Sequence, residues 1–358
     1  MSETIATPLT KLLGIKHPIM LAGMNVAAGP ALAAAVTNAG GLGVIGGVNY
    51  TPEMLKETID ELKEDLVDKN APFGVDLLLP KVGAGARKTN YDYTHGKLPE
   101  LMDIIIESGA KLFVSAVGVP PKWVVEKCHK AGILVMNMIG SPKHVKYCLA
   151  AGVDIICAQG GEGGGHTGDV ATSILIPSVV DLCKGHKSKL TGQPIYVVAA
   201  GGIFDGRGLA MSLALGAEAV WVGTRFVASE EAGAPPRHKK GVVDCGYHDT
   251  IRTLIYTGRP LRIKKGKFVM DWETNRSEEI KELCAKGKLP YEKDLEELKK
   301  SGRELTFEEQ VDAMPLLMGQ VAGAIKNVQP AKQIIDEMMR DAIKVMKQNA
   351  KRIISSSL

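Results

Sequence analysis

Residues 194–226 read PIYVVAAGGIFDGRGLAMSLALGAEAVWVGTRF, and this stretch contains the unit from which the fold is predicted. An apolar run at 194–202 ends in glycines, a helical pattern follows, and a second apolar run at 219–226 ends in Gly-Thr-Arg-Phe. Both runs are nearly continuous rather than alternating, as in strands that are buried on both faces of a parallel sheet. The stretch therefore predicts a strand, a helix and a second parallel strand.

Working outward, the same kind of apolar run recurs in the preceding sequence, at residues 18–24, 41–46, 72–79, 111–118, 133–140 and 153–160. The segments between these runs have helical patterns, and several begin near Pro or Ser and end with Gly, which are the usual start and stop signals of helices. Eight strands alternating with helices predict an α/β fold, a closed (β/α)₈ TIM barrel. The alternative, an open doubly wound sheet, would need less apolar edge strands, and no run has that character.

The rhythm breaks after the eighth run. Residues 228–318 are polar and rich in Lys and Glu, with short helical stretches at 277–287 and 291–302. We therefore expect a barrel in residues 1–227 and a mostly helical insertion or lid in 228–318, on the catalytic face. Residues 319–358 are expected to return to the barrel with a long amphipathic C-terminal helix.

Composition narrows the class of protein. Hydrophobic residues make up 45% and charged residues 23% of the 358 residues, which is typical of globular proteins and excludes bulk disorder. The net charge is +4, and the densest basic run, RPLRIKKGK at 259–267, has no interleaved aromatic residues, so nucleic-acid binding is not expected. We interpret this run as a solvated loop or edge that can also attract an anion.

The sequence also bears on location in the cell. No apolar stretch of about 18 residues occurs, so no membrane span is expected. The N-terminal residues lack the pattern of a signal peptide, and none of the six cysteines has C-x₂-C spacing, which together favour the cytoplasm. The C-terminal Ser-Ser-Leu differs by one residue from the peroxisomal address Ser-Lys-Leu, which leaves the peroxisome as an alternative.

Two predicted strands end in phosphate-binding sequences. Gly201 and Gly202 follow the seventh run, and Gly223 and Thr224 follow the eighth. In TIM barrels the loops after strands seven and eight commonly bind phosphate through backbone N–H groups and a helix N-terminus. Glycine lets the backbone approach the phosphate, and Thr224 adds a hydroxyl. The alternative is a pair of tight turns without a ligand.

A glycine-rich loop, GGEGGGHTG at 160–168, follows the sixth run. Ordering so many glycines is entropically unfavourable, which packing alone does not explain. A flat ring lying against the backbone would explain it. His166 would then lie at the edge of the ring, where its ordinary pKa of ~6.5 suits an acid–base group. The alternative is a structural histidine.

Polar or soft groups close several other strands at the end where barrel active sites lie. Asp76 and Gln159 can hydrogen-bond the heteroatoms of a ring, and Gly23 and Met24 end the first strand. Before the final helix, Gly319 and Gln320 either close the phosphate end of the site or form an ordinary helix N-terminal turn. No G-x-S-x-G or H-E-x-x-H motif occurs, which disfavours hydrolase and metal chemistry.

These motifs together resemble the nitronate monooxygenases, formerly called 2-nitropropane dioxygenases. The resemblance covers nearly the whole chain, through HPIMLAGM, NAGGLGVIGG, PFGVDLLL, QGGEGGGHTG, AAGGIFDGRG, ALGAEAVWVGTRF and MGQVAG. That family shares its FMN-dependent barrel with NAD(P)H:quinone reductases and with flavin-type enoyl-acyl-carrier-protein reductases. The resemblance therefore implies an FMN cofactor and no metal.

The resemblance also implies roles for individual residues. The family's E-x-G-G-H-x-G element is matched by Glu162, Gly164, Gly165, His166 and Gly168, which makes His166 the catalytic base. The resemblance implies that the FMN phosphate lies at the glycine turns after strands seven and eight, at Gly201, Gly202, Gly223 and Thr224. It implies further cofactor contacts at the other strand ends, in the glycine-rich loop and at the MGQ match, namely Gly23, Met24, Asp76, Gln159, Gly164, Gly165, Met318, Gly319 and Gln320.

The branch of the superfamily is indicated by fewer residues. Gln159 and the segment 257–273 resemble nitronate monooxygenases, and Met138 stands where quinone reductases have Lys. Asp76 departs from the family, which usually has Asn there, and Gly163 replaces a commoner small residue.

We therefore expect oxidation of a small anionic substrate, an alkyl nitronate such as propionate-3-nitronate, by O₂, in a monomer or homodimer. The alternatives are a reductase that passes electrons from NAD(P)H to a quinone or enoyl thioester, and a non-catalytic protein that holds the cofactor.

Overall fold

Eight parallel strands form the predicted (β/α)₈ barrel in a computed structural model that describes residues 3–353. Each strand lies within one predicted run: β1 (Ile19–Leu21), β2 (Gly43–Gly46), β3 (Phe73–Leu78), β4 (Leu112–Ala116), β5 (Leu134–Ile139), β6 (Ile155–Gln159), β8 (Tyr196–Ala200) and β9 (Ala219–Val222). The order around the sheet is β1-β9-β8-β6-β5-β4-β3-β2. Leu42 closes the ring, because its carbonyl accepts from the Leu21 N–H (2.9 Å) and its N–H donates to the Ile19 carbonyl (3.0 Å).

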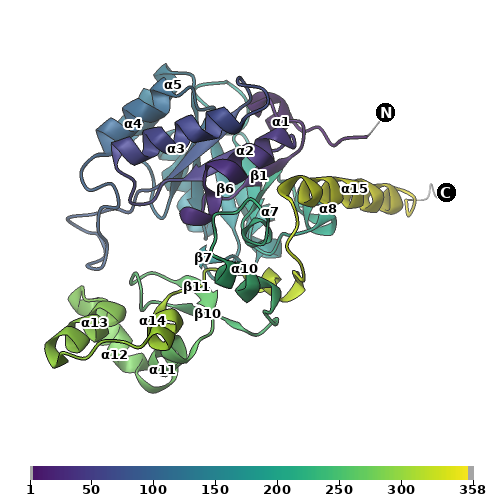
Figure 1. The fold of residues 1–358 in the computed structure, drawn as a ribbon. Helices are drawn as coiled ribbons and strands as arrows, with labels where there is room; N and C mark the ends of the chain where they lie inside the picture. The colour runs from purple at the N-terminus through teal and green to yellow at the C-terminus, as the bar shows by residue number, and fades with distance from the viewer. Residues whose placement is uncertain (1–2, 354–358) are drawn as a thin grey trace.

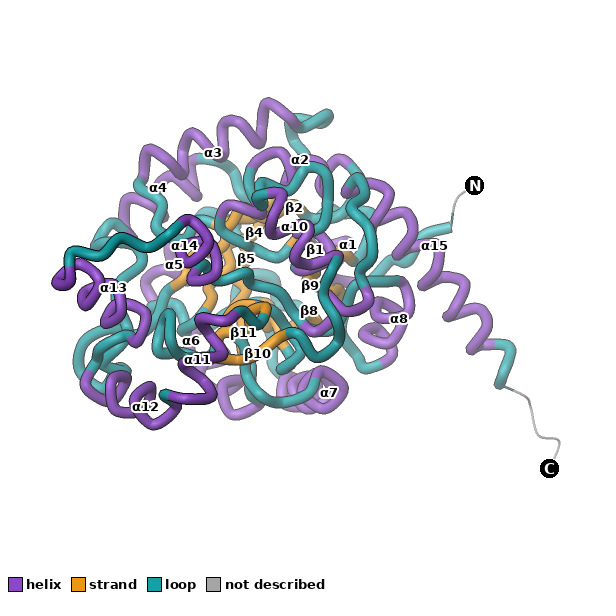
Figure 2. Tube along the Cα trace, turned by 60° about the horizontal axis from the view of Figure 1, so that its bottom comes forward, coloured by secondary structure: helices purple, strands orange, loops and turns teal. Residues whose placement is uncertain are grey.

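Helices surround the barrel on its outside, as Figures 1 and 2 show. They are α2 (Pro30–Asn38), α3 (Pro52–Asp65), α4 (Leu98–Glu107), α5 (Lys122–Lys130), α6 (Val145–Ala151), α7 (Thr172–Cys183), α8 (Gly206–Ala214) and α15 (Ala331–Ala350). The C-terminal helix α15 packs against α8 on one side and α2 on the other, so it completes the ring of helices. Local capping starts several of them: Asp205, for example, accepts from the Gly208 N–H (2.9 Å) at the N-terminus of α8.

The core has two layers because both faces of the closed sheet are buried. One layer lies between the strands and the surrounding helices. The other fills the barrel interior with side chains such as Val114, Met136 and Trp221. The short helix α1 (Pro8–Leu13) adds Leu9 and Leu13 to this interior layer. The interior is therefore a packed core rather than a channel.

The segment after β9 contains more β-structure than the sequence suggested. It comprises α9 (Thr224–Val227), α10 (Pro236–Val243), β10 (Thr250–Thr253), β11 (Leu261–Lys264), α11 (Lys267–Asn275), α12 (Ser277–Lys286), α13 (Pro290–Ser301), α14 (Phe307–Ala313) and the 3₁₀ helix η3 (Gln320–Ala324). The hairpin β10–β11 was not predicted. It pairs with a short strand β7 (Gly165–His166) to form a three-stranded antiparallel sheet.

This result corrects one interpretation of the sequence. The basic run 259–267 is not a solvated loop, because Leu261–Lys264 form the central strand of the small sheet and Arg259 and Arg262 are half-buried. Figure 1 shows the hairpin and α11–α14 on one side of the barrel, and Figure 2 shows β10 and β11 across the barrel end. These helices and the hairpin share a small core of their own around the fully buried Trp272. The boundaries proposed for the insertion stay a prediction.

The structure bears on one of the two sequence features that were used to predict location, the lack of a membrane span, and does not describe the other, the C-terminal tripeptide. The C-terminal Ser-Ser-Leu, residues 356–358, lies outside the described residues. Between residues 3 and 353, no helix combines the length and the apolar character needed to span a membrane.

Gly43 tests how tightly the barrel is built. A Cβ atom added to Gly43 would lie 1.9 Å from the carbonyl oxygen of Ala33 in α2, so alanine must push strand and helix apart. We expect Gly43→Ala to lower the free energy of unfolding by about 3 kcal/mol, measured by urea denaturation. Gly29→Ala is the matched control, since its Cβ would meet nothing closer than 3.6 Å. An equal loss in both variants would contradict this account of the strand–helix contact.

Candidate active site

The predicted site residues meet at the end of the barrel where the strands finish. Along each strand alternate side chains point inward, and the interior cluster identifies which set does so. The last inward positions, which form a floor across the barrel end, are Ala22, Gly46, Asp76, Ala116, Met138, Gln159, Ala200 and Gly223. Five of these are Ala or Gly, so the floor is flat and low. Such a floor can accept a planar ring above it.

Asp76 is the unusual member of this floor. Its side chain is buried, its Oδ1 atom has no hydrogen-bond partner, and burial raises its pKa well above the ordinary value. A Cβ atom on Gly23 would lie 2.3 Å from Asp76 Oδ2, so the carboxyl group lies against the bare backbone of the β1 end. Two predicted residues are therefore in contact, and one of them has a polar atom that lacks a partner.

The glycine-rich loop is held against the segment before η3. The Gln320 N–H donates to the Glu162 carbonyl (2.9 Å), and a Cβ atom on Gly164 would lie 2.6 Å from the Gly319 nitrogen. The Gly319 N–H in turn donates to Thr224 Oγ1 (2.9 Å), which leaves the proton of that hydroxyl for another acceptor. Three segments that are far apart in sequence thus meet at one point.

The turn after β8 has the backbone that the sequence predicted for a phosphate site. Gly201 and Gly202 have φ values of +87° and +76°, a left-handed conformation that side chains rarely adopt. A Cβ atom on Gly201 would also lie 2.8 Å from the Gly160 carbonyl oxygen. The turn leads into α8, whose N-terminus is capped by the Asp205 carboxylate, so an anion at this turn would be held by the N–H groups of the turn itself.

Glu162, whose role the sequence left open, has a structural contact. Its carboxylate accepts from the Thr172 N–H (3.0 Å) and from the Thr172 hydroxyl (2.8 Å) at the N-terminus of α7. A carboxylate is favourable at that position because of the helix dipole. Glu162 therefore ties the glycine-rich loop to the barrel.

Gln159 supports the same loop from below. Its Nε2 donates to the carbonyls of Gly164 and His166, both at 3.2 Å. A Cβ atom on Gly163 would lie 2.5 Å from that nitrogen, which explains why the loop has glycine there. The amide nitrogen of Gln159 thus positions the loop, and only its oxygen is left for a ligand.

His166 lies in β7, and the insertion contacts it directly. Its Nε2 is 3.1 Å from Thr257 Oγ1, and the backbone of β7 pairs with Leu261 and Arg262 of β11. Burial, followed by the positive charge of Arg259, lowers the pKa of His166 to about 4. The imidazole is therefore neutral at pH 7 and can accept a proton.

Sequence reasoning missed Thr257 and Arg259. The Arg259 guanidinium donates to Asn90 Oδ1 (3.0 Å) and to the Val117 carbonyl (2.9 Å) at the end of β4. Within residues 3–353 Arg259 forms no salt bridge. Burial lowers the pKa of Arg259, and the positive charge of the nearby Arg87 lowers it further. The only sequence signal for these residues was the basic run itself, whose position over the barrel end depends on the tertiary fold.

Strain marks the same corner of the site. Val117 has φ +69°, although a β-branched residue is rarely found in the left-handed region. Its carbonyl is the acceptor for Arg259, so the strained turn and the cation hold each other in place.

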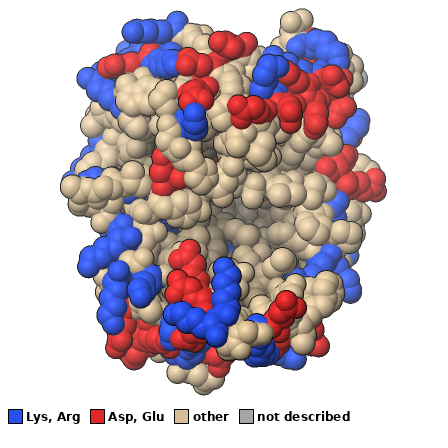
Figure 3. Space-filling view, turned by 60° about the vertical axis from the view of Figure 1, so that its left-hand side comes forward, with Lys and Arg blue, Asp and Glu red and all other residues tan. Residues whose placement is uncertain are grey.

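Figure 3 shows a hollow in the surface with mainly uncharged groups inside and charged groups around it.

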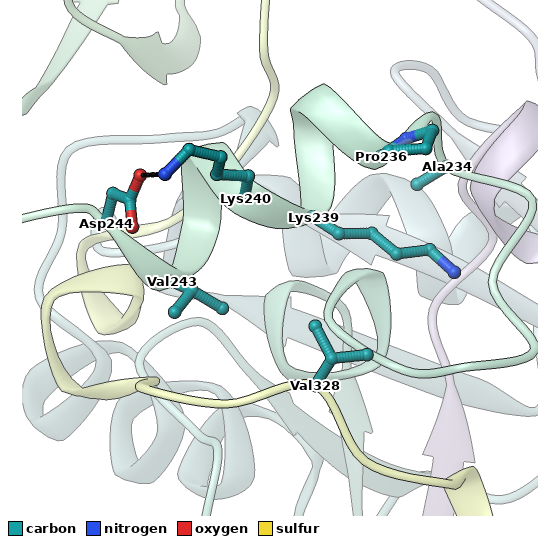
Figure 4. Close-up of a pocket in the computed structure, with 7 residues that line it drawn as sticks. All are labelled: Ala234, Pro236, Lys239, Lys240, Val243, Asp244 and Val328. Atoms are coloured by element: carbon teal, nitrogen blue, oxygen red, sulfur yellow. Dashed lines mark hydrogen bonds and ion pairs between the residues drawn. The ribbon is translucent and has the colours of Figure 1, made fainter.

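A separate cavity of about 560 Å³ lies beside α10 and contains none of the predicted residues (Figure 4). It is lined by Ala234, Pro236, Lys239, Lys240, Val243, Asp244 and Val328. Asp244 is paired with Lys240 (2.5 Å), and Lys239 donates to the Glu230 carbonyl. Its polar groups are therefore used within the protein, and the barrel end remains the candidate site.

Comparison with known proteins identifies the family of the chain. The family model described as nitronate monooxygenase matches residues 6–341. A (3aS,4S,5R,7aS)-5-hydroxy-7a-methyl-1-oxo-octahydro-1H-indene-4-carboxyl-CoA dehydrogenase from Mycobacterium tuberculosis is 32% identical, over 95% of this chain and 96% of its own length. A probable nitronate monooxygenase from Staphylococcus saprophyticus is 33% identical, over 74% of this chain and 80% of its own. The structure of FabK from Thermotoga maritima superposes with TM-score 0.77 and 31% identity, covering 98% of this chain and 100% of that one.

Gly164 tests whether the contact between the loop and the MGQ segment builds the site. We expect Gly164→Ala to weaken FMN binding at least tenfold, because the new methyl group displaces Gly319 and with it Thr224. Titration of the apoprotein by flavin fluorescence measures this. Gly29→Ala should bind FMN as the wild type does, and unchanged affinity in Gly164→Ala would show that this contact does not shape the site.

Proposed function

Because the chain belongs to the nitronate monooxygenase family, we propose that it is an FMN-dependent enzyme that oxidises alkyl nitronates with O₂, with His166 as its base. The observation that carries the proposal is the neutral His166 beside the unpaired cation of Arg259 at the barrel end. Such a pair suits a substrate that is anionic or becomes anionic when it loses a proton.

The residues present fit FMN. The left-handed turn at Gly201–Gly202 and the free proton of Thr224 would hold its phosphate. The low floor with Asp76 and the glycine-rich loop would border its ring. When bound, the flavin supplies an acceptor for electrons taken from the substrate and a means of passing them to O₂.

Hydrogen bonds support one tautomer of His166. The Thr257 hydroxyl donates to the Arg259 carbonyl (3.3 Å), so its oxygen is left to accept from Nε2–H of His166 (3.1 Å). That arrangement leaves the Nδ1 lone pair as the proton acceptor. Thr257 is thus a positioning residue that orients the imidazole. His166 would take the proton from a neutral nitroalkane and keep that proton beside the nitronate that results.

Arg259 has two electrostatic effects. Its charge attracts an anionic substrate and stabilises negative charge that develops as a carbon acid loses its proton. The same charge disfavours protonation of His166, which keeps the base available below neutral pH. The main-chain and amide acceptors of Arg259 are neutral, so its charge is not cancelled by a nearby carboxylate.

These effects predict the pH dependence of activity. With a neutral nitroalkane, kcat/KM of the wild type should fall on the acid side only near pH 4, since His166 is unprotonated above that pH. Arg259→Gln should move this acid limb upward, toward the ordinary histidine pKa of ~6.5, because removal of a cation raises the pKa of its neighbour. An unmoved limb would show that Arg259 does not act on the base.

His166→Asn provides the complementary measurement. We expect FMN to remain bound, and turnover of neutral nitroalkanes to fall roughly 10²–10⁴-fold, while preformed nitronates still react. Unchanged rates on both substrates would make His166 a structural residue.

A second candidate is oxidation of an acyl-CoA thioester, at a carbon that the thioester carbonyl makes acidic. The observation in its favour is coverage: the carboxyl-CoA dehydrogenase matches 95% of this chain, whereas the probable nitronate monooxygenase matches 74%. The same neutral base and cation would serve either substrate, and fold does not decide between them.

One anaerobic experiment separates the candidates. Oxidised enzyme is mixed without O₂ with propionate-3-nitronate, a saturated acyl-CoA, NADH and NADPH in turn, and the flavin absorbance is followed. We expect rapid bleaching by the nitronate, and recovery on admitting air. Bleaching by acyl-CoA alone would assign the thioester reaction, and bleaching by a nicotinamide alone would make the protein a reductase.

A further inference from the structure

Asp76 is the one acidic group on the floor of the site, and its surroundings differ from those of other buried carboxyl groups. We propose that Asp76 is a neutral carboxylic acid at physiological pH, and that it donates a hydrogen bond to the edge of the bound flavin ring. This inference rests on the proposed flavin cofactor and goes beyond it by assigning the proton of one side chain in the floor.

The environment of Asp76 disfavours the ionised form. The side chain is 3% exposed, and within residues 3–353 no basic group forms a salt bridge with it. Its Oδ1 atom is buried without a hydrogen-bond donor. An ionised carboxylate in such a place would lose its hydration without compensation, so the proton is retained.

The residues around the carboxyl group are apolar or carry no charge. Gly23 presents only backbone, and the carboxyl group lies near enough to the buried Cys157 thiol on β6 to add to the effect of burial in raising the pKa of that thiol. The cationic side chain of Arg259 contacts Asn90 and Val117 instead. Asp76 thus has a buried oxygen, Oδ1, that finds no hydrogen-bond partner among residues 3–353, which is unusual for a buried polar side chain unless a ligand binds it.

A second buried carboxyl group in the same barrel, that of Asp154, has hydrogen-bond partners for both of its oxygens. Asp154 is 1% exposed, but its Oδ1 accepts from Ser188 (2.5 Å), and its Oδ2 accepts from the Val135 N–H (2.8 Å) and lies 3.0 Å from His129 Nε2. Donors surround Asp154, so it serves as an acceptor within the protein. Asp76 has no such shell and faces the space where the ring is proposed.

The chemistry of the ring edge matches a protonated acid. The pyrimidine edge of a flavin alternates carbonyl groups with an N–H group, so it needs both a donor and an acceptor opposite it. A carboxylic acid offers one O–H donor and one carbonyl acceptor, as an amide does, whereas a carboxylate only accepts. Asp76 can therefore replace Asn in this role only while it keeps its proton.

The test combines infrared spectra, flavin affinity and stability for Asp76→Asn, Asp76→Leu and the matched control Asp154→Asn. In the wild-type apoprotein at pH 7 we expect a C=O stretch of a protonated carboxyl group that is lost in Asp76→Asn, persists in Asp154→Asn and shifts when FMN binds. Absence of that band would show that Asp76 is ionised and would overturn the proposal.

Flavin affinity gives an independent result, measured from pH 6 to pH 10 by fluorescence quenching. FMN should bind wild type and Asp76→Asn about equally near pH 6, and Asp76→Leu roughly tenfold more weakly, as expected for loss of a hydrogen bond. Wild-type affinity should fall once the carboxyl group ionises, whereas that of Asp76→Asn should not. Parallel pH profiles for the two would overturn the donor role. Failure of the wild type to bind FMN at all would instead refute the proposed cofactor, while the infrared band would still report the proton.

The raised pKa of Asp76 fixes the direction in which the stability of the apoprotein changes with pH. The carboxyl group ionises near its ordinary pKa of ~3.9 in the unfolded chain but at a higher pH in the folded protein, so wild type loses stability as pH rises through that interval. Asp76→Asn should therefore become more stable than wild type between pH 4 and pH 7, and match it below about pH 3. A difference that does not change with pH would contradict a raised pKa.

Discussion

The pairing of Gly165–His166 with Leu261–Arg262 is the contact on which the candidate site depends. It joins the glycine-rich loop at the end of β6 to a hairpin nearly a hundred residues later. Without this pairing His166 would lie on a flexible loop, far from Thr257 and Arg259. Glycine makes the contact possible, because the loop backbone must also fit against Gly319 and above Gln159, where a methyl group would collide. The loop is thus positioned by backbone contacts on three sides.

The electrostatics of the barrel end follow from this arrangement. Arg259 and Arg87 approach from the rim and contact neutral acceptors, namely backbone carbonyls and an amide. Below them the floor contains Asp76, whose pKa is raised well above its ordinary value by burial. The rim of the site is therefore cationic, the imidazole of His166 is neutral at pH 7, and the floor contains a carboxyl group that is proposed to be protonated. A low dielectric strengthens each of these interactions, because partly buried charges are screened less than exposed ones.

The relationship to nitronate monooxygenases is consistent with this distribution of charge, and it makes the chain a flavin-dependent oxidoreductase. The likeness to a carboxyl-CoA dehydrogenase over 95% of the chain is consistent with the same features. In both reactions proposed for this site the carbon that loses a proton lies next to an electron-withdrawing group, so a neutral base beside a cation would serve either. The hairpin β10–β11 lies at the end of the barrel where His166 is held, because β11 pairs with β7.

The sequence by itself determined the barrel, because strands buried on both faces consist of continuous apolar runs, and the length and terminal glycines of each run are visible in the local sequence. It also placed Gly201 and Gly202 at a strand end and His166 in the loop after the sixth strand, because the order of strands and loops fixes the face of the barrel on which they lie. Only the tertiary structure showed that the four-residue strand β11 in the basic segment pairs with β7 and that Thr257 and Arg259 lie beside His166. It alone also showed that Asp76 Oδ1 has no hydrogen-bond partner among residues 3–353. Those features depend on burial and on neighbours distant in the chain, which set hydrogen bonding and pKa but leave no local pattern in the residues themselves.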